Sequence, residues 1–484
     1  MYYTEKYGVI FVADINEIMR RITCGRCEII GLGRSNLPLC AFLSKKGATN
    51  IIGRDGNANF DKTEELEKLG VTVIKGENYL DGIGGNEPDN TLIFRSPGIR
   101  PDVPQIKAAI DNGAILTSEM ELFFELTKAT VIGITGSDGK TTTTTLVSKL
   151  LSLECEKRGN GAKVYLGGNI GKPLLPDVDE MTEKDFAVVE LSSFQLMTMK
   201  KSPSRSVITN ITPNHLNWHI DMDEYIEAKK NIYLHAPCES LTVNLENNVT
   251  AEIGKSANIK TTFFSSAETP DIEGKNIIFV KDGNIVYYDG KTEKKILSVS
   301  DIKLPGKHNV ENYMAAISAI YGFVSLETIK EIATTFGGVE HRLELVRELR
   351  GVKYYNSSID TSPTRTEAAL STFAKKVIII CGGSDKHVPF DTLAEALCKR
   401  AKTVVLTGAT AEKIKDAVIA CGEYANCGLE IIEEKEFENA VKAASGAAVP
   451  GDVVILSPAC ASFDAFKNFE ERGNFFKKIV NDLK

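Results

Sequence analysis

A glycine-rich segment has the residue types and spacing that bind the phosphates of a nucleotide. It reads Gly136-Ser137-Asp138-Gly139-Lys140-Thr141-Thr142 and lies between an apolar run, 129–134, and a helical pattern, 143–153. Glycines let successive backbone N–H groups converge on phosphate oxygens, and a helix N-terminus adds positive potential. Lys140 would reach the β- and γ-phosphates, and the Thr141 hydroxyl would complete a Mg²⁺ shell. The pattern, G-x-x-G-K-T, is shorter than the standard one, but it favours ATP binding over a tight turn with an exposed lysine.

Two residues with metal-binding side chains follow predicted strands of the same region. Glu190 ends the apolar run 186–190, and His215 comes shortly after the run 205–210. The carboxyl ends of parallel strands meet at one edge of a sheet, where helix N-termini also point. Either residue alone is more typical of a cap or a core hydrogen bond. Beside a phosphate loop, the pair favours a metal site.

A second glycine-rich turn lies near the N-terminus. Gly31-Leu32-Gly33-Arg34-Ser35-Asn36 has two of the three dinucleotide-binding glycines, and Asp55 stands about where a ribose-binding acid would be. Read alone, this weak motif suggests an enzyme that uses a nicotinamide cofactor.

The elements around these motifs predict an α/β protein. Three times, short apolar runs alternate with glycine-rich turns and helical stretches such as 37–46 and 119–128, which is typical of parallel sheets with crossover helices. Turn-rich Thr/Val/Ile segments between about 241 and 300 predict hairpins in a small antiparallel layer. We expect three domains: a Rossmann-like domain at 1–118, a central, mostly parallel domain like those of phosphate-loop ATPases at 119–340, and a second Rossmann-like domain at 341–484.

Composition excludes several classes of protein. The chain has 484 residues, 43% of them hydrophobic and 25% charged, with a formal net charge of −8. This balance is that of a globular protein, and it gives no reason to expect nucleic acid or an anionic membrane as a partner. No apolar run is long enough to span a membrane, and the first 14 residues lack a signal-peptide pattern, so we expect a cytoplasmic protein. The ten cysteines are scattered, and we interpret the single C-x-x-C, Cys24 to Cys27, as chance.

Several motifs together resemble those of the muramyl ligase (Mur ligase) family. They occur in the family's order from about Glu28 to Phe476, and the last two most resemble the members that add D-glutamate. The motifs are Gly133-Ile134-Thr135-Gly136-Ser137-Asp138-Gly139-Lys140-Thr141, Gly168-Asn169-Ile170-Gly171, Glu190-Leu191-Ser192-Ser193-Phe194-Gln195-Leu196, Leu304-Pro305-Gly306-Lys307-His308-Asn309, Glu340-His341-Arg342-Leu343-Glu344, Leu456-Ser457-Pro458-Ala459-Cys460-Ala461-Ser462-Phe463-Asp464 and Phe466-Lys467-Asn468-Phe469-Glu470-Glu471-Arg472-Gly473.

The resemblance implies an ATP-dependent acid–amino-acid ligase of peptidoglycan precursor synthesis, and we expect a monomer. The carboxylate of UDP-N-acetylmuramoyl-L-alanine would take the γ-phosphoryl group of ATP, and the amine of D-glutamate would attack the resulting acyl phosphate. A carboxylate has no good leaving group, and phosphorylation supplies one. Such a protein works mostly by positioning its anionic substrates and neutralising charge.

The resemblance also assigns metal and ATP contacts. Lys140 and Thr141 would hold ATP and Mg²⁺, Glu190 and His215 would be metal ligands, and Lys229 corresponds to a lysine that is carbamylated in this family. A carbamate turns a cation into an anionic ligand, which suits a second Mg²⁺. From composition alone, Lys229 is an ordinary solvated helix lysine.

The remaining roles that the resemblance implies are substrate contacts. Asn309, Asn312 and Arg342 would contact adenine and phosphate, and Asn169 the muramoyl-alanine end. The first domain would bind UDP through Gly33, Arg34, Ser35, Asp55 and Gly98, and the third would bind D-glutamate through Thr361, Lys386, Ser462, Phe463 and Phe469.

Several positions differ from the family's usual residues. Aspartate is usual at Asn214 and Asn217, asparagine at Asp138, an acid at Ser357 and alanine at Asp360. These substitutions support one alternative, a non-catalytic nucleotide-binding paralogue. A related ligase with another acceptor, of another muramyl or the folylpolyglutamate type, is the second alternative.

Overall fold

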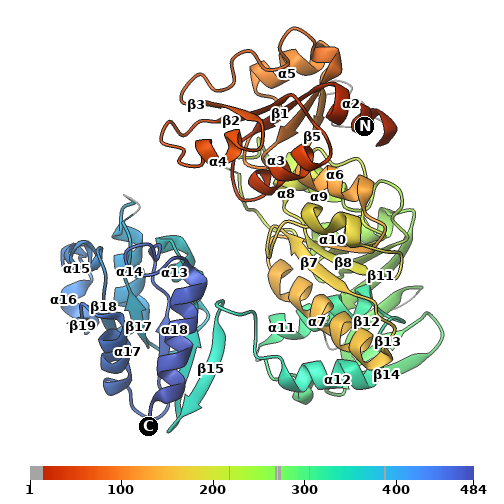
Figure 1. Ribbon diagram of the computed structural model, residues 1–484. Helices are drawn as coiled ribbons and strands as arrows, with labels where there is room; N and C mark the ends of the chain where they lie inside the picture. The colour runs from red at the N-terminus through yellow and green to blue at the C-terminus, as the bar shows by residue number, and fades with distance from the viewer. Residues whose placement is uncertain (1–14, 217, 268–269, 271–273, 305, 386–387) are drawn as a thin grey trace. The chain divides into compact units, whose positions relative to one another are not determined.

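The computed structural model of the chain describes residues 15–484 apart from 217, 268–269, 271–273, 305 and 386–387. The chain divides into two compact units, Met1–Thr335 and Phe336–Lys484. Among the described residues the strands form three sheets, two in the first unit and one in the second, and helices accompany each sheet (Figure 1). The α/β class predicted from the alternating pattern is confirmed.

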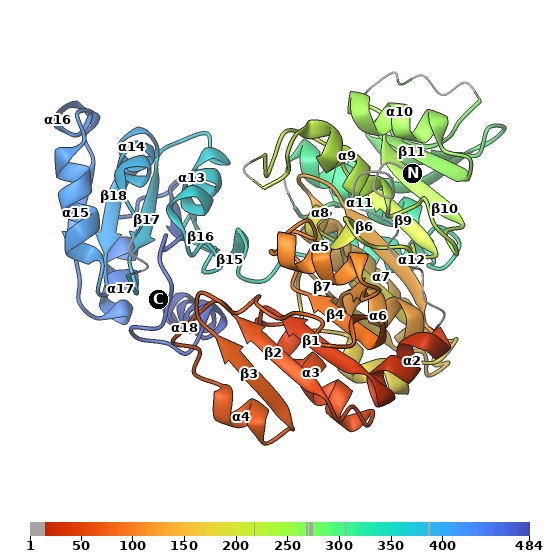
Figure 2. The ribbon, with the colours of Figure 1, turned by 90° about the horizontal axis from the view of Figure 1, so that it is seen from above.

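The first sheet is parallel, with the order β3-β2-β1-β4-β5, and Figure 2 shows β3, β2, β1 and β4 side by side. Its central strands are buried, as expected where helices cover both faces. The strands are β1 (Arg26–Ile30), β2 (Ile51–Asp55), β3 (Val71–Lys75), β4 (Thr91–Arg95) and β5 (Ile115–Thr117). The helices are α2 (Ile15–Cys24), α3 (Asn36–Lys45), α4 (Thr63–Glu67), η1 (Pro88–Asn90), α5 (Pro104–Asp111) and α6 (Glu119–Leu126).

A buried ion pair connects the two central strands of this sheet. Arg54 Nε donates to Glu28 Oε2 at 2.5 Å, and both side chains are almost wholly inaccessible. The same guanidinium donates to the carbonyls of Tyr79 and Asp81 at 2.7 and 2.8 Å. The pair therefore holds the loop after β3 against the end of β2, beside Asp55.

Glu28→Gln is expected to destabilise the first unit by about 3–5 kcal/mol, because it leaves the Arg54 guanidinium buried without a counter-charge. Asp179→Asn is the matched control, since it removes the partner of the partly exposed Lys46 (2.7 Å) and should cost less than about 1 kcal/mol. Thermal and urea unfolding would measure both. Equal stability of the two variants would contradict the importance given to the buried pair.

The second sheet carries the phosphate loop and is parallel over most of its width. Its order is β14-β13-β12-β11-β10-β9-β6-β8-β7. The strands are β6 (Thr130–Thr135), β7 (Val164–Gly168), β8 (Phe186–Glu190), β9 (Arg205–Ile208), β10 (Ser240–Asn244), β11 (Lys260–Ser265), β12 (Asn276–Lys281), β13 (Asn284–Tyr288) and β14 (Glu293–Ser298). The helices are α7 (Lys140–Arg158), η2 (Leu175–Glu180), α8 (Ser193–Leu196), α9 (Met222–Lys230), α10 (Asn248–Ser256), η3 (Val299–Asp301), α11 (Lys307–Ala319) and α12 (Leu326–Thr335). Figure 1 shows α7 and α11 next to each other along this sheet.

The predicted hairpins are present, but they do not form a separate layer. β12 pairs in parallel with β11, and β13 and β14 then add antiparallel to the same sheet. The exposed backbone groups at the edge of β11 explain this arrangement, since pairing satisfies them. The antiparallel strands thus extend the sheet sideways.

The second unit contains the third sheet, with the order β15-β16-β20-β17-β18-β19. Only the β15–β16 pair is antiparallel among its described strands. The strands are β15 (Glu344–Leu349), β16 (Val352–Asn356), β17 (Val377–Cys381), β18 (Ala401–Leu406), β19 (Glu430–Glu433) and β20 (Val453–Leu456). The helices are α13 (Pro363–Ser371), α14 (Asp391–Arg400), α15 (Ala411–Ala420), α16 (Tyr424–Cys427), α17 (Phe437–Gly446) and α18 (Phe469–Asp482).

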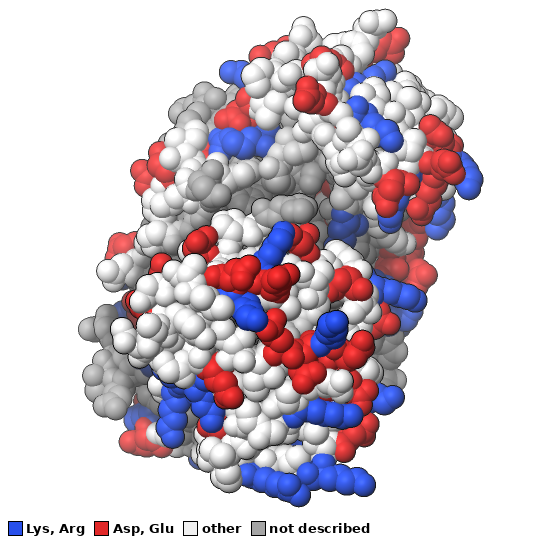
Figure 3. Space-filling view, turned by 90° about the vertical axis from the view of Figure 1, so that its left-hand side faces the viewer, with Lys and Arg blue, Asp and Glu red and all other residues white. Residues whose placement is uncertain are grey.

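The surface of the protein carries charges of both signs. Acidic and basic side chains are interspersed on the face shown in Figure 3. Among the described residues, no helix has the combined length and apolar character needed to cross a bilayer.

Candidate active site

The phosphate loop lies between β6 and α7, and backbone geometry explains its glycines. Gly136 and Gly139 both have positive φ, at 149° and 78°. A Cβ at position 136 would collide with the Thr209 hydroxyl, and one at position 139 would collide with Asn312 Oδ1. The helix begins at Lys140, three residues earlier than predicted, so the N–H groups of its first turn belong to the loop.

Two lysines of this loop region donate to one carbonyl oxygen. Lys140 Nζ lies 2.9 Å from the Gly136 carbonyl oxygen and 2.8 Å from that of Ser137. Lys229 Nζ, from α9, lies 2.9 Å from the same Gly136 oxygen. Two lysine side chains therefore meet where the motif predicts phosphate.

Lys229 is not a solvated helix lysine. Only 1% of it is exposed, and its ammonium also donates to Thr135 Oγ1 at 3.2 Å. Burial lowers the pKa of Lys229 well below its usual value, and the charge of Lys140 lowers it further, while Glu190 and Asp138 oppose the shift. A neutral amine is the form that can react with CO₂, so the surroundings favour the carbamylation that the resemblance implies.

Glu190 supplies an unpaired carboxylate oxygen near Lys229. It ends β8, is 1% exposed, and accepts a hydrogen bond at Oε1 from Asn169 Nδ2 at 2.8 Å. Its Oε2 is buried and has no hydrogen-bond partner within the described part of the chain. A buried orphan oxygen of this kind is costly unless a ligand pairs with it. The donor chemistry therefore fits a bound cation.

His215 lies in the loop after β9. It has a left-handed backbone, φ 56°, and its ring meets the Phe194 ring edge-on with centroids 4.9 Å apart. Partial burial, with the charges of Lys140 and Lys229, lowers the pKa of His215. The imidazole is thus neutral at neutral pH, as a metal ligand must be.

The predicted metal set is not a cluster of acids and histidines alone. In the described ranges, no group of three or more His, Cys, Asp and Glu side chains is arranged to hold a metal ion. The predicted set has two such residues, Glu190 and His215, beside Thr141 and Lys229. This composition suits Mg²⁺, which takes few protein ligands and completes its shell with water and substrate phosphates.

One of the predicted adenine contacts lies directly under the phosphate loop. Asn312, on α11, accepts from Thr143 Oγ1 at 3.3 Å, and its amide donates to Asn309 Oδ1 at the same distance. The third predicted contact, Arg342, belongs to the second unit.

The N-terminal glycine-rich turn lies against the end of β2, where Asp55 contacts its backbone. Asp55 Oδ2 accepts from the Leu32 N–H at 2.8 Å. Asn36, in place of the third glycine, donates to the Gly31 carbonyl at 2.8 Å and so closes the turn. Arg34 reaches the second sheet and donates to the Gly171 carbonyl. Ser35 precedes α3, and Gly33 has open space where a side chain would point.

The described residues of the predicted D-glutamate site lie in loops beside the third sheet or, for Phe469, at the start of α18. Ser462 is buried, Phe463 is 74% exposed, and Phe469 begins α18 with its ring 5.9 Å from that of His341. Thr361 lies just before α13. Lys386 is outside the described residues.

Sequence reasoning gave no role to Arg472, which organises these loops. Its guanidinium is buried and donates to the carbonyls of Ser358, Cys460 and Ala461 at 3.0–3.1 Å. Burial lowers the pKa of Arg472 to about 10. The side chain therefore ties the loop before Ser462 to the loop after β16.

The substitutions relative to the family pattern are accommodated locally. The Asp138 N–H donates to Asn210 Oδ1 at 2.9 Å, and Asn214 is exposed. Ser357 Oγ accepts from the Leu343 N–H at 3.1 Å, and Asp360 accepts from Ser457 Oγ at 2.8 Å. Burial raises the pKa of Asp360. Asn217 lies outside the described residues.

Known proteins that are similar to this chain identify its family. The family model described as Mur ligase middle domain matches residues 134–320, and the one described as Mur ligase, glutamate ligase domain matches 341–460. The protein named UDP-N-acetylmuramoylalanine--D-glutamate ligase in Acetivibrio thermocellus is 46% identical over 474 residues, 97% of this chain and 99% of that one. The protein of the same name in Clostridium perfringens is 45% identical over 473 residues, with the same shares of both chains.

Solved structures support the fold. A crystal structure of MurF from Acinetobacter baumannii has a TM-score of 0.55 and 16% identity, covering 97% of this chain and 98% of that one. Identity at this level shows the fold alone. The full-length relatives, near 46% identity, show more: the chain belongs to the Mur ligase family.

Proposed function

We propose that this protein joins D-glutamate to UDP-N-acetylmuramoyl-L-alanine, with ATP as the source of the activating phosphoryl group. The observation that carries the proposal is the pairing of a phosphate loop with buried Lys229 and the unpaired Glu190 Oε2 beside it. The full-length relatives that bear the D-glutamate ligase name support the choice of acceptor.

The loop residues account for the first half of the reaction. Backbone N–H groups at the start of α7 bind the phosphates, and Lys140 moves from the Gly136 and Ser137 carbonyls to the β- and γ-phosphates. Its charge then offsets the charge that develops as the phosphoryl group passes to the alanine carboxylate. Asn312 and Asn309 support the nucleotide side of the loop.

Glu190, His215 and Thr141 would hold Mg²⁺, with carbamylated Lys229 as a ligand of a second ion. Bound Mg²⁺ would supply positive charge that offsets the negative charge of the phosphates. Asn169 fixes one Glu190 oxygen at 2.8 Å, which leaves the other oriented for binding, and it would contact the muramoyl-alanine end of the substrate.

The N-terminal and C-terminal parts of the chain bind the two substrates that are joined. The turn at Gly33–Ser35, with Asp55 and Gly98, binds the UDP end of the precursor. Ser462, Thr361, Lys386, Phe463 and Phe469 form the D-glutamate pocket, where hydroxyls and an ammonium suit an amino acid with two carboxylates.

Phosphate release from ATP tests the proposal. With UDP-N-acetylmuramoyl-L-alanine present, D-glutamate is expected to trigger release, whereas L-glutamate, L-lysine and meso-diaminopimelate are not. Release with L-lysine or meso-diaminopimelate would instead support a ligase with another acceptor. No release under any condition would support the non-catalytic paralogue that the substitutions at Ser357 and Asp360 suggest.

A further inference from the structure

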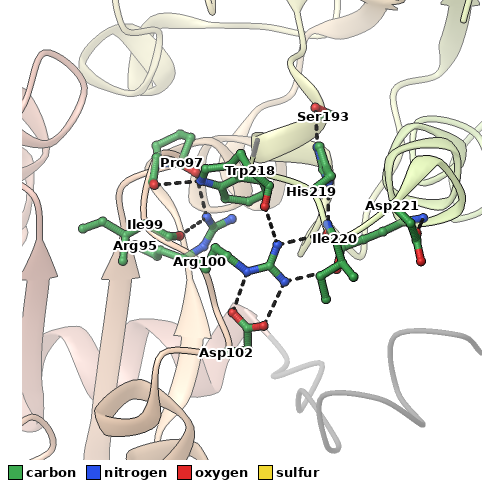
Figure 4. A network of polar contacts seen from close by, with 12 residues as sticks. Arg95, Pro97, Ile99, Arg100, Asp102, Ser193, Trp218, His219, Ile220 and Asp221 are labelled. Atoms are coloured by element: carbon green, nitrogen blue, oxygen red, sulfur yellow. Dashed lines mark hydrogen bonds and ion pairs between the residues drawn. The ribbon is translucent and has the colours of Figure 1, made fainter. Parts of the chain in front are cut away.

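An arginine of the domain that contains the first sheet contacts the loop that carries His215. Arg100 lies in the segment between β4 and α5, two residues after Gly98 (Figure 4). Its guanidinium donates to both oxygens of Asp102 at 2.8 Å and to both oxygens of Glu224 at 3.0 and 3.1 Å. It also donates to the Trp218 carbonyl at 2.8 Å. These contacts with described residues use all three nitrogens of the guanidinium.

The carboxylate that receives Arg100 organises the start of α9, the helix that carries Lys229. Glu224 is wholly buried, and its Oε2 also accepts from the Ile220 N–H at 2.9 Å and contacts His219 Nδ1 at 3.2 Å. The Glu224 N–H donates in turn to the N-cap residue Asp221 at 2.8 Å. Arg100 thus anchors the first turn of the helix whose last turn holds Lys229.

His219 extends the network toward β8. Its Nε2 lies 2.9 Å from Ser193 Oγ, in the segment that follows Glu190, and the ring is buried. The backbone N–H groups of Trp218 and His219 both donate to the His215 carbonyl, at 3.0 and 2.9 Å. The network therefore reaches the segments of three of the four predicted ligands, Glu190, His215 and Lys229.

Trp218 closes the network on the side of the predicted substrate loop. Its indole N–H donates to the Gly98 carbonyl at 3.0 Å, and its ring lies 5.1 Å from the Arg100 guanidinium. Arg95 connects the same loop to the segment after β8. It donates to the Ile99 carbonyl at 2.6 Å and to the Phe194 carbonyl at 2.9 Å. The loop that would contact the UDP substrate and the loop with His215 are thus held to each other.

We propose that Arg100 is a positioning residue for the reaction, acting through Glu224 and His219. It holds the segment 215–224 and the start of α9 so that His215 and Lys229 face Glu190 and the phosphate loop. The inference rests on the proposed function for its kinetic consequences, whereas the anchoring itself rests on the contacts alone. A lysine cannot replace Arg100, since an ammonium lacks the planar set of donors that pairs with both oxygens of two carboxylates and with a carbonyl at the same time.

The test uses the full chain with Arg100→Lys and Glu224→Gln. Lys46→Ala is the matched control, because Lys46 also pairs between the first two sheets, with Asp179 at 2.7 Å, but contacts none of the network. Thermal unfolding first establishes that each variant is folded. If Arg100→Lys does not fold, Glu224→Gln carries the test, since it keeps the size of the side chain and removes the charge.

Two readouts follow. Both variants are expected to lower kcat by roughly 10²-fold, with KM for ATP and for UDP-N-acetylmuramoyl-L-alanine changed less than about threefold, because positioning is lost and binding groups are kept. The second needs no substrate: Trp218 is the chain's single tryptophan, so acrylamide quenching of its fluorescence reports on the network. Quenching should rise in both variants and stay at the wild-type level in Lys46→Ala.

Three results would overturn the inference. A raised KM for the UDP substrate with kcat preserved would make Arg100 a substrate-binding group. Quenching at the wild-type level in both folded variants would show that Arg100 does not hold the segment. An equal loss of kcat and an equal rise in quenching in Lys46→Ala would indicate that any contact between the first two sheets has these effects. If the wild-type chain itself releases no phosphate, the proposed function fails, but the quenching comparison still decides whether Arg100 holds the segment.

Discussion

Lys140→Ala is expected to reduce D-glutamate-dependent phosphate release by at least about 10²–10³-fold, the usual cost of removing a preorganised charge from a transition state. Lys140 starts α7 and rests on the carbonyls of Gly136 and Ser137, at 2.9 and 2.8 Å. No other described ammonium except that of Lys229 bonds to this loop, and Lys229 is buried beneath it. The variant therefore loses the mobile charge that would follow the transferred phosphoryl group.

Steady-state kinetics and calorimetric titration with ATP would measure the effect. Lys149→Ala is the matched control, since Lys149 lies on the exposed face of the same helix and should leave both rate and affinity unchanged. Retention of most activity in Lys140→Ala would show that the phosphate loop does not carry the reaction.

Lys229→Ala is expected to be nearly inactive and to regain part of its activity with formate or acetate. The substitution removes the group that would become a carbamate, and a small carboxylate can take its place beside Glu190. The lowered pKa of Lys229, caused first by burial, supplies the neutral amine that carbamylation requires. If no small carboxylate restores activity, the required group is the lysine ammonium itself and not a carbamate.

The neighbouring lysine provides the control for this prediction. Lys230, also on α9, pairs with Glu227 at 2.6 Å, and Lys230→Ala should keep its activity and show no response to formate. NMR of the wild-type protein in ¹³C-bicarbonate should show a carbamate signal that is absent from Lys229→Ala. Full activity of Lys229→Ala would contradict the assignment directly.

Local patterns predicted the phosphate loop well, because its chemistry depends on residues adjacent in sequence. Gly136, Gly139 and Lys140 form one turn between a strand and a helix, and the structure places them so. The burial and the lowered pKa of Lys229 could not be predicted from composition. Its burial results from packing of α9 against Thr135 and Gly136, more than 90 residues earlier.

The positioning residues were missed for a similar reason. Arg100 and Glu224 are 124 residues apart, and nothing in the local sequence of either residue indicates a partner. Arg472 stood inside a recognised motif, but its role depends on carbonyls of Ser358 and Cys460, which have no sequence signature. The hairpins of 276–298 were recognisable from their turns. Their parallel pairing with β11 was not.

The antiparallel extension of the second sheet leaves β14 at its margin, with β13 as its one strand partner among the described strands. The first half of β14 is Glu293-Lys294-Lys295, all exposed, and Lys281 pairs with Glu293 at 2.7 Å. A strand from another molecule that docked there would have to desolvate these charges. The hairpins therefore protect the catalytic sheet against self-association, and neutralising Lys294 and Lys295 should lower the concentration at which the protein aggregates.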